Sequence, residues 1–177
     1  MAIILASDVA KEARYTRLAN GDLEVQGAGI IFKNFSGAPT QFNPAGGKRT
    51  FSLVLPKELA DDLAEEGWNI RRRSAKDDGD EDMFYTEIVV NMDSNYPPKL
   101  HILYRYDDRE KLVLLDETSL DELDNNLLSD VDIIIHPFNH GRSNSSGATV
   151  KGYLKSLYAT QVPSVEFGGK YNRFFVD

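Results

Sequence analysis

The sequence predicts a mainly β domain, an antiparallel β-barrel that is closed or partly closed, with two short helices and extended loops. Short segments in which apolar and polar residues alternate recur along the chain, and Gly, Pro, Asn and Ser gather between them. Only two segments show helical periodicity, and both are short. A parallel Rossmann-type sheet would need long helices alternating with the strands, and the sequence lacks them.

The chain divides into three parts. Residues 1–26 carry small residues and mixed charge with weak periodicity, so we expect an N-terminal arm there. Residues 27–160 contain the predicted strands and helices and form the domain, and residues 161–177 form a tail. A chain of 177 residues is long enough for one hydrophobic core and leaves little room for two.

The strands and the core follow from alternation of apolar side chains. In chain order, we expect strands over residues 30–35, 50–55, 68–73, 83–92, 100–106, 111–115, 131–138 and 150–159. Their inward positions predict a core that contains Phe51, Leu53, Phe84, Ile88, Ile102, Val131, Ile133, Ile135 and Leu154.

Two helices are expected between these strands. The first begins at Pro56, carries Leu59 and Leu63 on its apolar face, and ends at Gly67. The second covers residues 119–128, with Ser119 as N-cap and Glu122 as its capping-box partner. Residues 36–47, 77–82 and 140–147 read as loops, and the acidic loop 77–82 should be exposed and mobile.

Composition argues against most kinds of catalysis. The chain has no cysteine, which excludes disulfide scaffolds, thiol catalysis and cysteine-bound zinc, and it has only three histidines. The segment 46–50 resembles a phosphate-binding P-loop only superficially, because Arg49 follows Lys48 where Ser or Thr is required. His136 and His140 are separated by Pro137, so they read as surface histidines better than as a zinc pair. We therefore expect no enzyme, no metal and no cofactor, with a metal-dependent nuclease as the third choice of function.

Charge is distributed unevenly. The net charge is -8, but residues 77–130 hold 16 of the 28 acidic side chains, whereas residues 28–76 hold five acids and eight bases. Residues 131–177 again hold more bases than acids. Because binding depends on the local field over one face, the acidic total does not exclude a nucleic acid as the ligand.

Three clusters of cations and aromatic rings predict a nucleic-acid-binding face. Single strands are bound by cations that contact phosphates and by rings that stack on bases. The first cluster covers residues 33–49, the second is the Arg-rich strand after Trp68, and the third alternates Lys and Tyr on the last strand. The predicted binding residues are Lys33, Phe35, Phe42, Lys48, Arg49, Arg71, Arg73, Lys151, Tyr153 and Lys155.

Several stretches resemble a family of tailed-phage proteins. They are Gly29–Gly37, Phe42–Gly46, Arg49–Leu55, Glu65–Asn69, Val131–Asn139 and Val150–Tyr158, in that order. The family is similar to OB-fold single-stranded DNA-binding proteins of phage replication modules. The resemblance implies an OB-like barrel without enzymatic activity that coats and protects single-stranded DNA during replication or recombination, without sequence preference.

The resemblance also implies surroundings and partners. These are single-stranded DNA, replication or recombination proteins, and the cytoplasm of the bacterial host, with no membrane. The tail departs from the acidic tail of bacterial proteins with the same role, because it contains Lys170, Arg173, Phe174 and Phe175. The alternative function is an acidic virion or host-interaction protein that mimics a nucleic acid. The sequence leaves the oligomeric state open.

Overall fold

The structure is a computed structural model, and it describes residues 13–162 except residues 42, 78, 107, 142 and 144–146. This part of the chain is mainly β with two short helices, as the sequence predicts. The helices are α2 (Lys57–Glu66) and α3 (Asp121–Asn125). The strands are β1 (Arg14–Arg17), β2 (Leu23–Gln26), β3 (Ile30–Asn34), β4 (Thr50–Leu55), β5 (Arg71–Arg73), β6 (Met83–Val89), β7 (Lys99–Tyr106), β8 (Arg109–Leu115), β9 (Leu128–Asn139) and β10 (Val150–Gln161).

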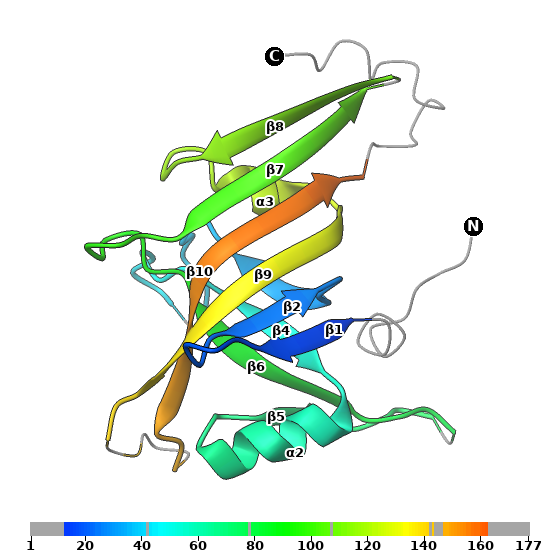
Figure 1. Cartoon of the computed structure of the whole chain (residues 1–177), viewed down its shortest axis with the longest axis vertical. Helices are drawn as coiled ribbons and strands as arrows, with labels where there is room; N and C mark the ends of the chain where they lie inside the picture. Colours follow the sequence, from blue (N-terminus) through cyan, green and yellow to red (C-terminus); the bar gives the residue numbers. More distant parts are fainter. Residues whose placement is uncertain are drawn as a thin grey trace.

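Strand β10 lies at the centre of the single ten-stranded sheet. Along one edge it pairs antiparallel with β9 over its whole length. Along the other edge its first half pairs with β6, through Gly152 and Tyr153, and its second half pairs with β7, from Ser156 to Thr160. Figure 1 shows β9 and β10 side by side across the molecule, with the β7–β8 hairpin at one end and α2 at the other.

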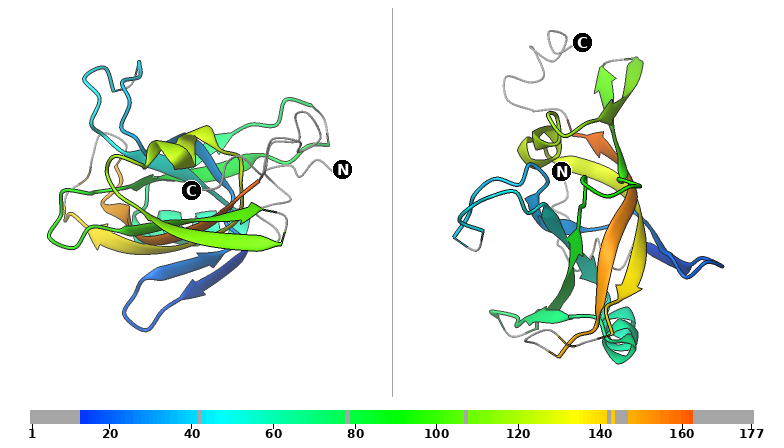
Figure 2. Two further views of the ribbon diagram at one scale, coloured as in Figure 1. Left: turned by 90° about the horizontal axis from the view of Figure 1, so that it is seen from above. Right: turned by 90° about the vertical axis from the view of Figure 1, so that its left-hand side faces the viewer.

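The sheet is curved but not closed, so the partly closed form of the predicted barrel fits and the closed form does not. The strand order runs β1-β2-β9-β10-β6-β4-β3, and the two end strands, β1 and β3, are not paired with each other. The right-hand view of Figure 2 shows this curvature, with the β7–β8 and β1–β2 hairpins projecting from the sheet.

The sheet is also not wholly antiparallel, which corrects the prediction. Both β6 and β7 run parallel to β10. The two strands follow each other along the same edge of β10, with residues 90–98 between them.

The N-terminal hairpin belongs to the sheet. Strand β2 pairs with β9, and its side chains Leu23 and Val25 are buried in the core. The backbone N–H of Ala28 donates to the carbonyl of Val131, which joins the segment after β2 to β9. Residues 14–26 are therefore integrated with the domain instead of forming a separate arm, while residues 1–12 of the predicted arm and residues 163–177 of the predicted tail lie outside the described residues.

The core agrees with the alternation of the strands. Eight of the nine predicted core residues are buried, and Phe84 packs against the core while partly exposed. Ile133 and Ile135 of β9 belong to the same cluster of buried side chains as Phe51 and Leu53 of β4. Burial of these large apolar side chains is the main stabilising contribution to the fold.

The two helices differ in how well their ends were predicted. Helix α2 follows Pro56 and ends at Gly67, whose φ of 103° lies in the left-handed region that favours glycine. Helix α3 is shorter than predicted, and its N-cap is Leu120. The capping box is absent because the Ser119 hydroxyl accepts a hydrogen bond from the backbone N–H of Asp116 instead.

Two segments before and after β6 also differ from the predictions. Of the expected strand 68–73, only β5 is a strand, and Trp68 forms an isolated parallel bridge with Val150. Strand β8 begins at Arg109, so the hairpin that joins it to β7 is tighter than the four-residue connection expected.

No helix of the described residues is long and apolar enough to cross a membrane.

Gly152 allows β10 to approach its neighbours closely. A Cβ at this position would lie 2.7 Å from a ring carbon of Trp68, 2.9 Å from Cγ2 of Ile135 and 2.9 Å from Cδ1 of Ile88. These three side chains are buried. Trp68 packs over Gly152 although it is not part of any of the named strands. Glycine is thus required at position 152, because any larger residue would collide with the buried indole ring of Trp68 and with its two aliphatic neighbours.

We predict that Gly152→Ala lowers the free energy of unfolding by about 1–3 kcal/mol, because the added methyl group overpacks the core. Chemical denaturation monitored by circular dichroism measures this. Lys151→Ala, at the neighbouring exposed position, should change stability by no more than about 0.5 kcal/mol. Equal stability of Gly152→Ala and the parent would show that the space around Gly152 accommodates a methyl group without strain.

Candidate nucleic-acid interface

The outer face of β10 presents the predicted alternation of cations and a ring. Lys151, Tyr153 and Lys155 are solvent-accessible, whereas Gly152 and Leu154 between them are buried. The three side chains therefore project together from the sheet, away from the core. This confirms their shared orientation, which is what a strand-borne binding face needs.

Two rings join Tyr153 on the same face. The ring centroid of Phe138 lies 6.5 Å from that of Tyr153, and the His140 ring lies 4.9 Å from Phe138 and 6.1 Å from Tyr153. The Tyr153 hydroxyl is 3.1 Å from Nε2 of His140. Phe138 is 49% exposed although it is a large apolar ring. No pattern in the sequence indicates Phe138, or His140 other than as a zinc candidate, because the pairing of Phe138 with Lys151 depends on the register of β9 and β10.

A groove lies beside this ring cluster. It has a volume of about 210 Å³, and its lining includes Arg71, Lys151, Glu87 and His140. Glu87 holds two cations at the surface, because its Oε1 lies 3.4 Å from Nζ of Lys48 and 3.7 Å from Nζ of Lys151. Three predicted cations from distant parts of the sequence are thus brought together at one place.

A second ring pair joins β3 to β6. Phe32 is 59% exposed and meets Tyr85 edge to face, with ring centroids 5.5 Å apart. Tyr85 is the cross-strand partner of Arg71, and Arg73 follows on the same exposed strand. Phe32 is not among the residues predicted from the sequence, since regular alternation places it on the face opposite Lys33 and Phe35.

The backbone at Phe32 explains why that alternation fails. Its φ is 51°, and the register of β3 on β4 shifts between Ile31 and Asn34. This irregularity turns Phe32 outward, and Phe35 is completely buried with its ring stacked on Phe51 at 5.2 Å. The predicted stacking of Phe35 on bases is therefore wrong, because the ring belongs to the core.

Lys33 is engaged with α3. Its Nζ donates to the carbonyl oxygens of Leu123 at 2.7 Å and Asn126 at 2.8 Å. Burial lowers the pKa of Lys33, and the nearby carboxylate of Asp124 only partly offsets this. The predicted phosphate contact of Lys33 does not fit this arrangement, because its ammonium group already caps the end of a helix.

The other residues predicted to bind nucleic acid are Arg49, two arginines of β5 and Phe42. Arg49 is partly buried, and its Nε has no hydrogen-bond partner among the described residues. In the acidic loop, Asp82 pairs with Arg72 and not with the outward Arg71 or Arg73. Phe42 lies outside the described residues.

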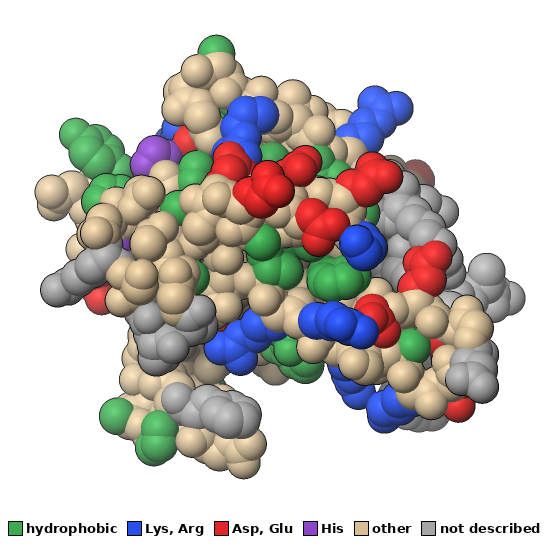
Figure 3. Space-filling model, turned by 90° about the horizontal axis from the view of Figure 1, so that it is seen from below, with side chains coloured by type: hydrophobic (Ala, Val, Ile, Leu, Met, Phe, Trp, Pro, Cys, Tyr) green, Lys and Arg blue, Asp and Glu red, His purple; other side chains and the backbone are tan. Residues whose placement is uncertain are grey.

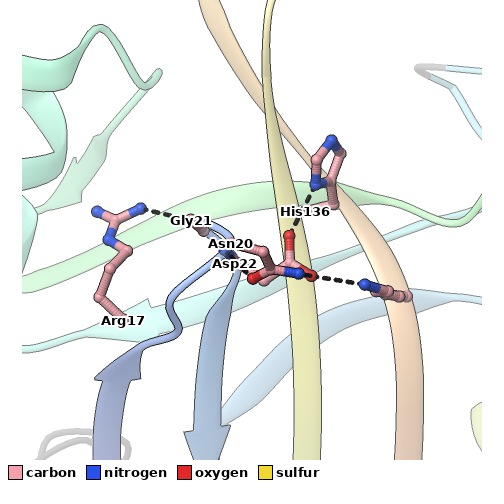
Figure 4. A network of polar contacts seen from close by, with 6 residues as sticks. Arg17, Asn20, Gly21, Asp22 and His136 are labelled. Carbon is pink, nitrogen blue, oxygen red and sulfur yellow. Dashed lines mark hydrogen bonds and ion pairs between the residues drawn. The ribbon is translucent and has the colours of Figure 1, made fainter.

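The buried carboxylate of Asp22 forms contacts with three polar side chains near Tyr153. Asp22, only 1% exposed, accepts from Nζ of Lys155 at 2.8 Å and from Nδ2 of Asn20 at 3.0 Å, and its Oδ1 lies 2.7 Å from Nδ1 of His136. Figure 4 shows these contacts converging on Asp22 from the β1–β2 turn, β9 and β10. Burial alone would raise the pKa of Asp22, but the hydrogen bonds from Lys155, His136 and Asn20 outweigh it and lower the pKa.

Acidic side chains gather on a different part of the surface. Helix α2 exposes Asp61, Asp62, Glu65 and Glu66, and an open pocket beside it is lined by Arg17 as well as by acids. Figure 3, which looks at the end of the molecule where α2 lies, shows acidic side chains gathered beside several Lys and Arg side chains. A local concentration of carboxylates of this kind repels phosphates.

No group of three or more His, Asp or Glu side chains within the described part of the chain could hold a metal ion. The arrangement offers aromatic rings, which are chemically suited to stacking on bases, and cations, which are chemically suited to contacting phosphates.

A family model matches residues 11–171, which is most of the chain. The family is described as "Putative phage ssDNA-binding domain". The chain belongs to this family. The match confirms the resemblance seen in the sequence, and it extends beyond both of the domain boundaries predicted at residues 27 and 160.

Two solved structures share the fold. One is a single-stranded DNA-binding protein from bacteriophage Enc34 in complex with ssDNA, with a TM-score of 0.51 and 14% identity over 92% of this chain and 95% of that chain. The other is a single-stranded DNA-binding protein from bacteriophage Enc34, with a TM-score of 0.50 and 14% identity over 91% of this chain and 88% of that chain. No curated protein matches the sequence.

We predict that Asp22→Asn lowers the free energy of unfolding by about 1–2 kcal/mol at pH 7, because the charged hydrogen bonds to Lys155 and His136 are lost. The folded-state pKa of Asp22 lies below its unfolded value, so its contribution is present above about pH 5 and declines as the pH falls below about 4. Denaturation at several pH values measures the difference between variant and parent.

Asp61→Asn, which removes an exposed carboxylate on α2 that pairs with Lys57, is the matched control. It should cost no more than about 0.5 kcal/mol. A stability difference for Asp22→Asn that is the same at pH 3 and pH 7 would show that the charge of Asp22 is not the source.

Proposed function

We propose that this protein binds single-stranded DNA, without catalysis, on the outer face formed by β10 and its neighbours β6 and β9. The observation that carries the proposal is that the Tyr153 and Phe138 rings pack beside His140, which lines one groove together with Lys151 and Arg71. Rings and cations in this arrangement can contact the bases and the backbone of a single strand together.

The contacts suit binding without sequence preference. Every base has a face that can stack, and each stacked base contributes about 1–3 kcal/mol. Phosphates are recognised by charge alone, and Lys48, Arg71 and Lys151 supply three positive charges around the groove.

The ion pairs of Glu87 do not prevent binding. Both pairs are long, at 3.4 and 3.7 Å, and their side chains are partly exposed. Such surface pairs stabilise a protein by only about 0–1 kcal/mol, so a phosphate can replace the carboxylate as the partner of Lys48 or Lys151.

The wider role follows from family membership. We infer that the protein coats and protects single-stranded DNA during phage replication or recombination, within the cytoplasm of the bacterial host. The Enc34 protein solved with ssDNA supports this inference through its shared fold. The OB-like character of the domain and contacts with replication or recombination proteins belong to the same proposal.

The first test uses the salt dependence of binding to distinguish phosphate contacts of cations from base stacking on rings. Each phosphate contact adds about 0.7 to the slope of log K against log salt for a single strand. Lys151→Ala should therefore reduce the slope by about 0.7, measured by fluorescence anisotropy with labelled oligo-dT. Lys57→Ala, which removes a surface lysine paired with Asp61 on α2, should leave the slope unchanged.

The second test concerns the ring. Tyr153→Ala should weaken binding to oligo-dT by about 1–3 kcal/mol and keep the parent's salt slope, because stacking releases no counterions. Tyr106→Ala, near the tip of the β7–β8 hairpin, is the control and should bind like the parent. The proposal is wrong if Tyr153→Ala and Lys151→Ala both stay folded and bind with the affinity and slope of the parent.

A further inference from the structure

The outer face of β10 carries a second ring beyond Lys155. Tyr158 is 46% exposed, and its ring stacks on His101 of β7 with centroids 4.3 Å apart and planes within 2° of parallel. The two residues are cross-strand partners in the parallel pairing of β10 with β7. One side of the Tyr158 ring is thus covered by imidazole, and the exposed remainder is held in a fixed orientation.

An irregularity in β10 places this ring on the same face as Tyr153. Residues five apart on a regular strand point to opposite faces. Here the register on β9 shifts between Leu154 and Ser156, so that Lys155 is an extra residue without a partner on β9. The burial of both Leu154 and Leu157 shows the result, because inward positions are three residues apart across the shift.

Cations continue along the face as well. Lys155 projects between the two tyrosines, where Asp22 orients it. On β7, Lys99 is exposed, and it pairs across the ladder with Ser156. Lys99 and His101 share the outer face, since Leu100 and Ile102 point into the core. The face therefore repeats the ring-and-cation pattern of the groove at a second place.

The carboxylate on the β9 residue paired with Tyr158 already accepts a hydrogen bond from the backbone. Asp132 of β9 is the partner of Tyr158 on its other side, and its Oδ1 accepts from the backbone N–H of Gly27 at 3.0 Å. This contact holds the carboxylate toward β2. The positive charges of Lys99 and Lys155 complement a phosphate backbone on the strand.

We propose that Tyr158, supported by His101, is a second base-stacking site, with Lys99 as its phosphate contact, so that the DNA runs along β10 from the groove toward β7. The inference rests on the proposed function and extends it to the path of the strand. The ring is already ordered by its partner, so less conformational entropy is lost when a base stacks on it.

The path has a defined length. Between Tyr153 and Tyr158, the β9 partner strand advances four residues, from His136 to Asp132. At about 3.3 Å per residue this separation is about 13 Å. A stacked strand rises about 3.4 Å per nucleotide, so at most about four nucleotides bridge the two sites. An oligonucleotide must exceed this length to occupy both fully.

The test compares two lengths of oligo-dT by fluorescence anisotropy, about 3 and about 20 nucleotides long. On the long strand, Tyr158→Ala should weaken binding by about 5- to 150-fold, which corresponds to one lost stacked base. Tyr158→Phe, which keeps the ring, should bind like the parent. On the short strand, Tyr158→Ala should lose much less than Tyr153→Ala, because the short strand does not need both sites.

Lys99→Ala tests the phosphate contact. It should reduce the salt slope on the long strand by about 0.7, and Lys99→Arg should restore it. Leu114→Ala is the matched control on the same face, since this exposed residue is the β8 partner of His101 and lies one strand farther from β10. Its binding to the long strand should equal that of the parent.

The inference is overturned if Tyr158→Ala is folded and binds both lengths as the parent does. If Tyr153→Ala still loses affinity in that case, DNA binding at the groove stands and only the second site fails. If neither variant loses affinity, the proposed function fails too. Reduced self-association of Tyr158→Ala and Leu114→Ala in sedimentation, with DNA binding intact, would assign this face to contacts between copies and would equally overturn the inference.

Discussion

The structure depends on the pairing of β10 along both of its edges. Strand β10, like β6, is hydrogen-bonded to three different strands, and the lack of a Cβ at Gly152 allows Trp68, Ile88 and Ile135 to approach β10 closely. The same pairing fixes the side chains on either side of Gly152. Lys151 and Tyr153 face outward because Gly152 and Leu154 are buried beneath them, so the stability of the sheet and the geometry of the interface have one cause.

Carboxylates hold the cations of this face in place. Glu87 does so for Lys48 and Lys151, and Asp22 does so for Lys155. The two carboxylates differ in how readily they release the cations that they hold. Glu87 is partly exposed and can give up its partners to phosphate at low cost, whereas Asp22 is buried and keeps Lys155 oriented. A chain with a net charge of -8 can therefore present a local surface that attracts a polyanion.

The sequence predicted what depends on local periodicity and missed what depends on register. The mainly β fold, α2, and the shared face of Lys151 and Tyr153 follow from spacing within one segment. Phe35 was assigned to the interface because a regular strand was assumed, and the positive φ at Phe32 reverses the faces beyond it. Phe138 and His140 were missed because their proximity to Tyr153 depends on how β9 pairs with β10. No local pattern in the sequence marks that register.

The central claim is that a single strand lies across the outer face of β10. The most direct measurement is ultraviolet crosslinking of the full chain to oligo-dT, followed by mass spectrometry of the crosslinked peptides. Crosslinks should concentrate on the aromatic residues of β9 and β10, with Phe138 and Tyr153 foremost. Crosslinks confined to the acidic surface of α2 or to the β1–β2 hairpin, with none on β9 or β10, would contradict the account.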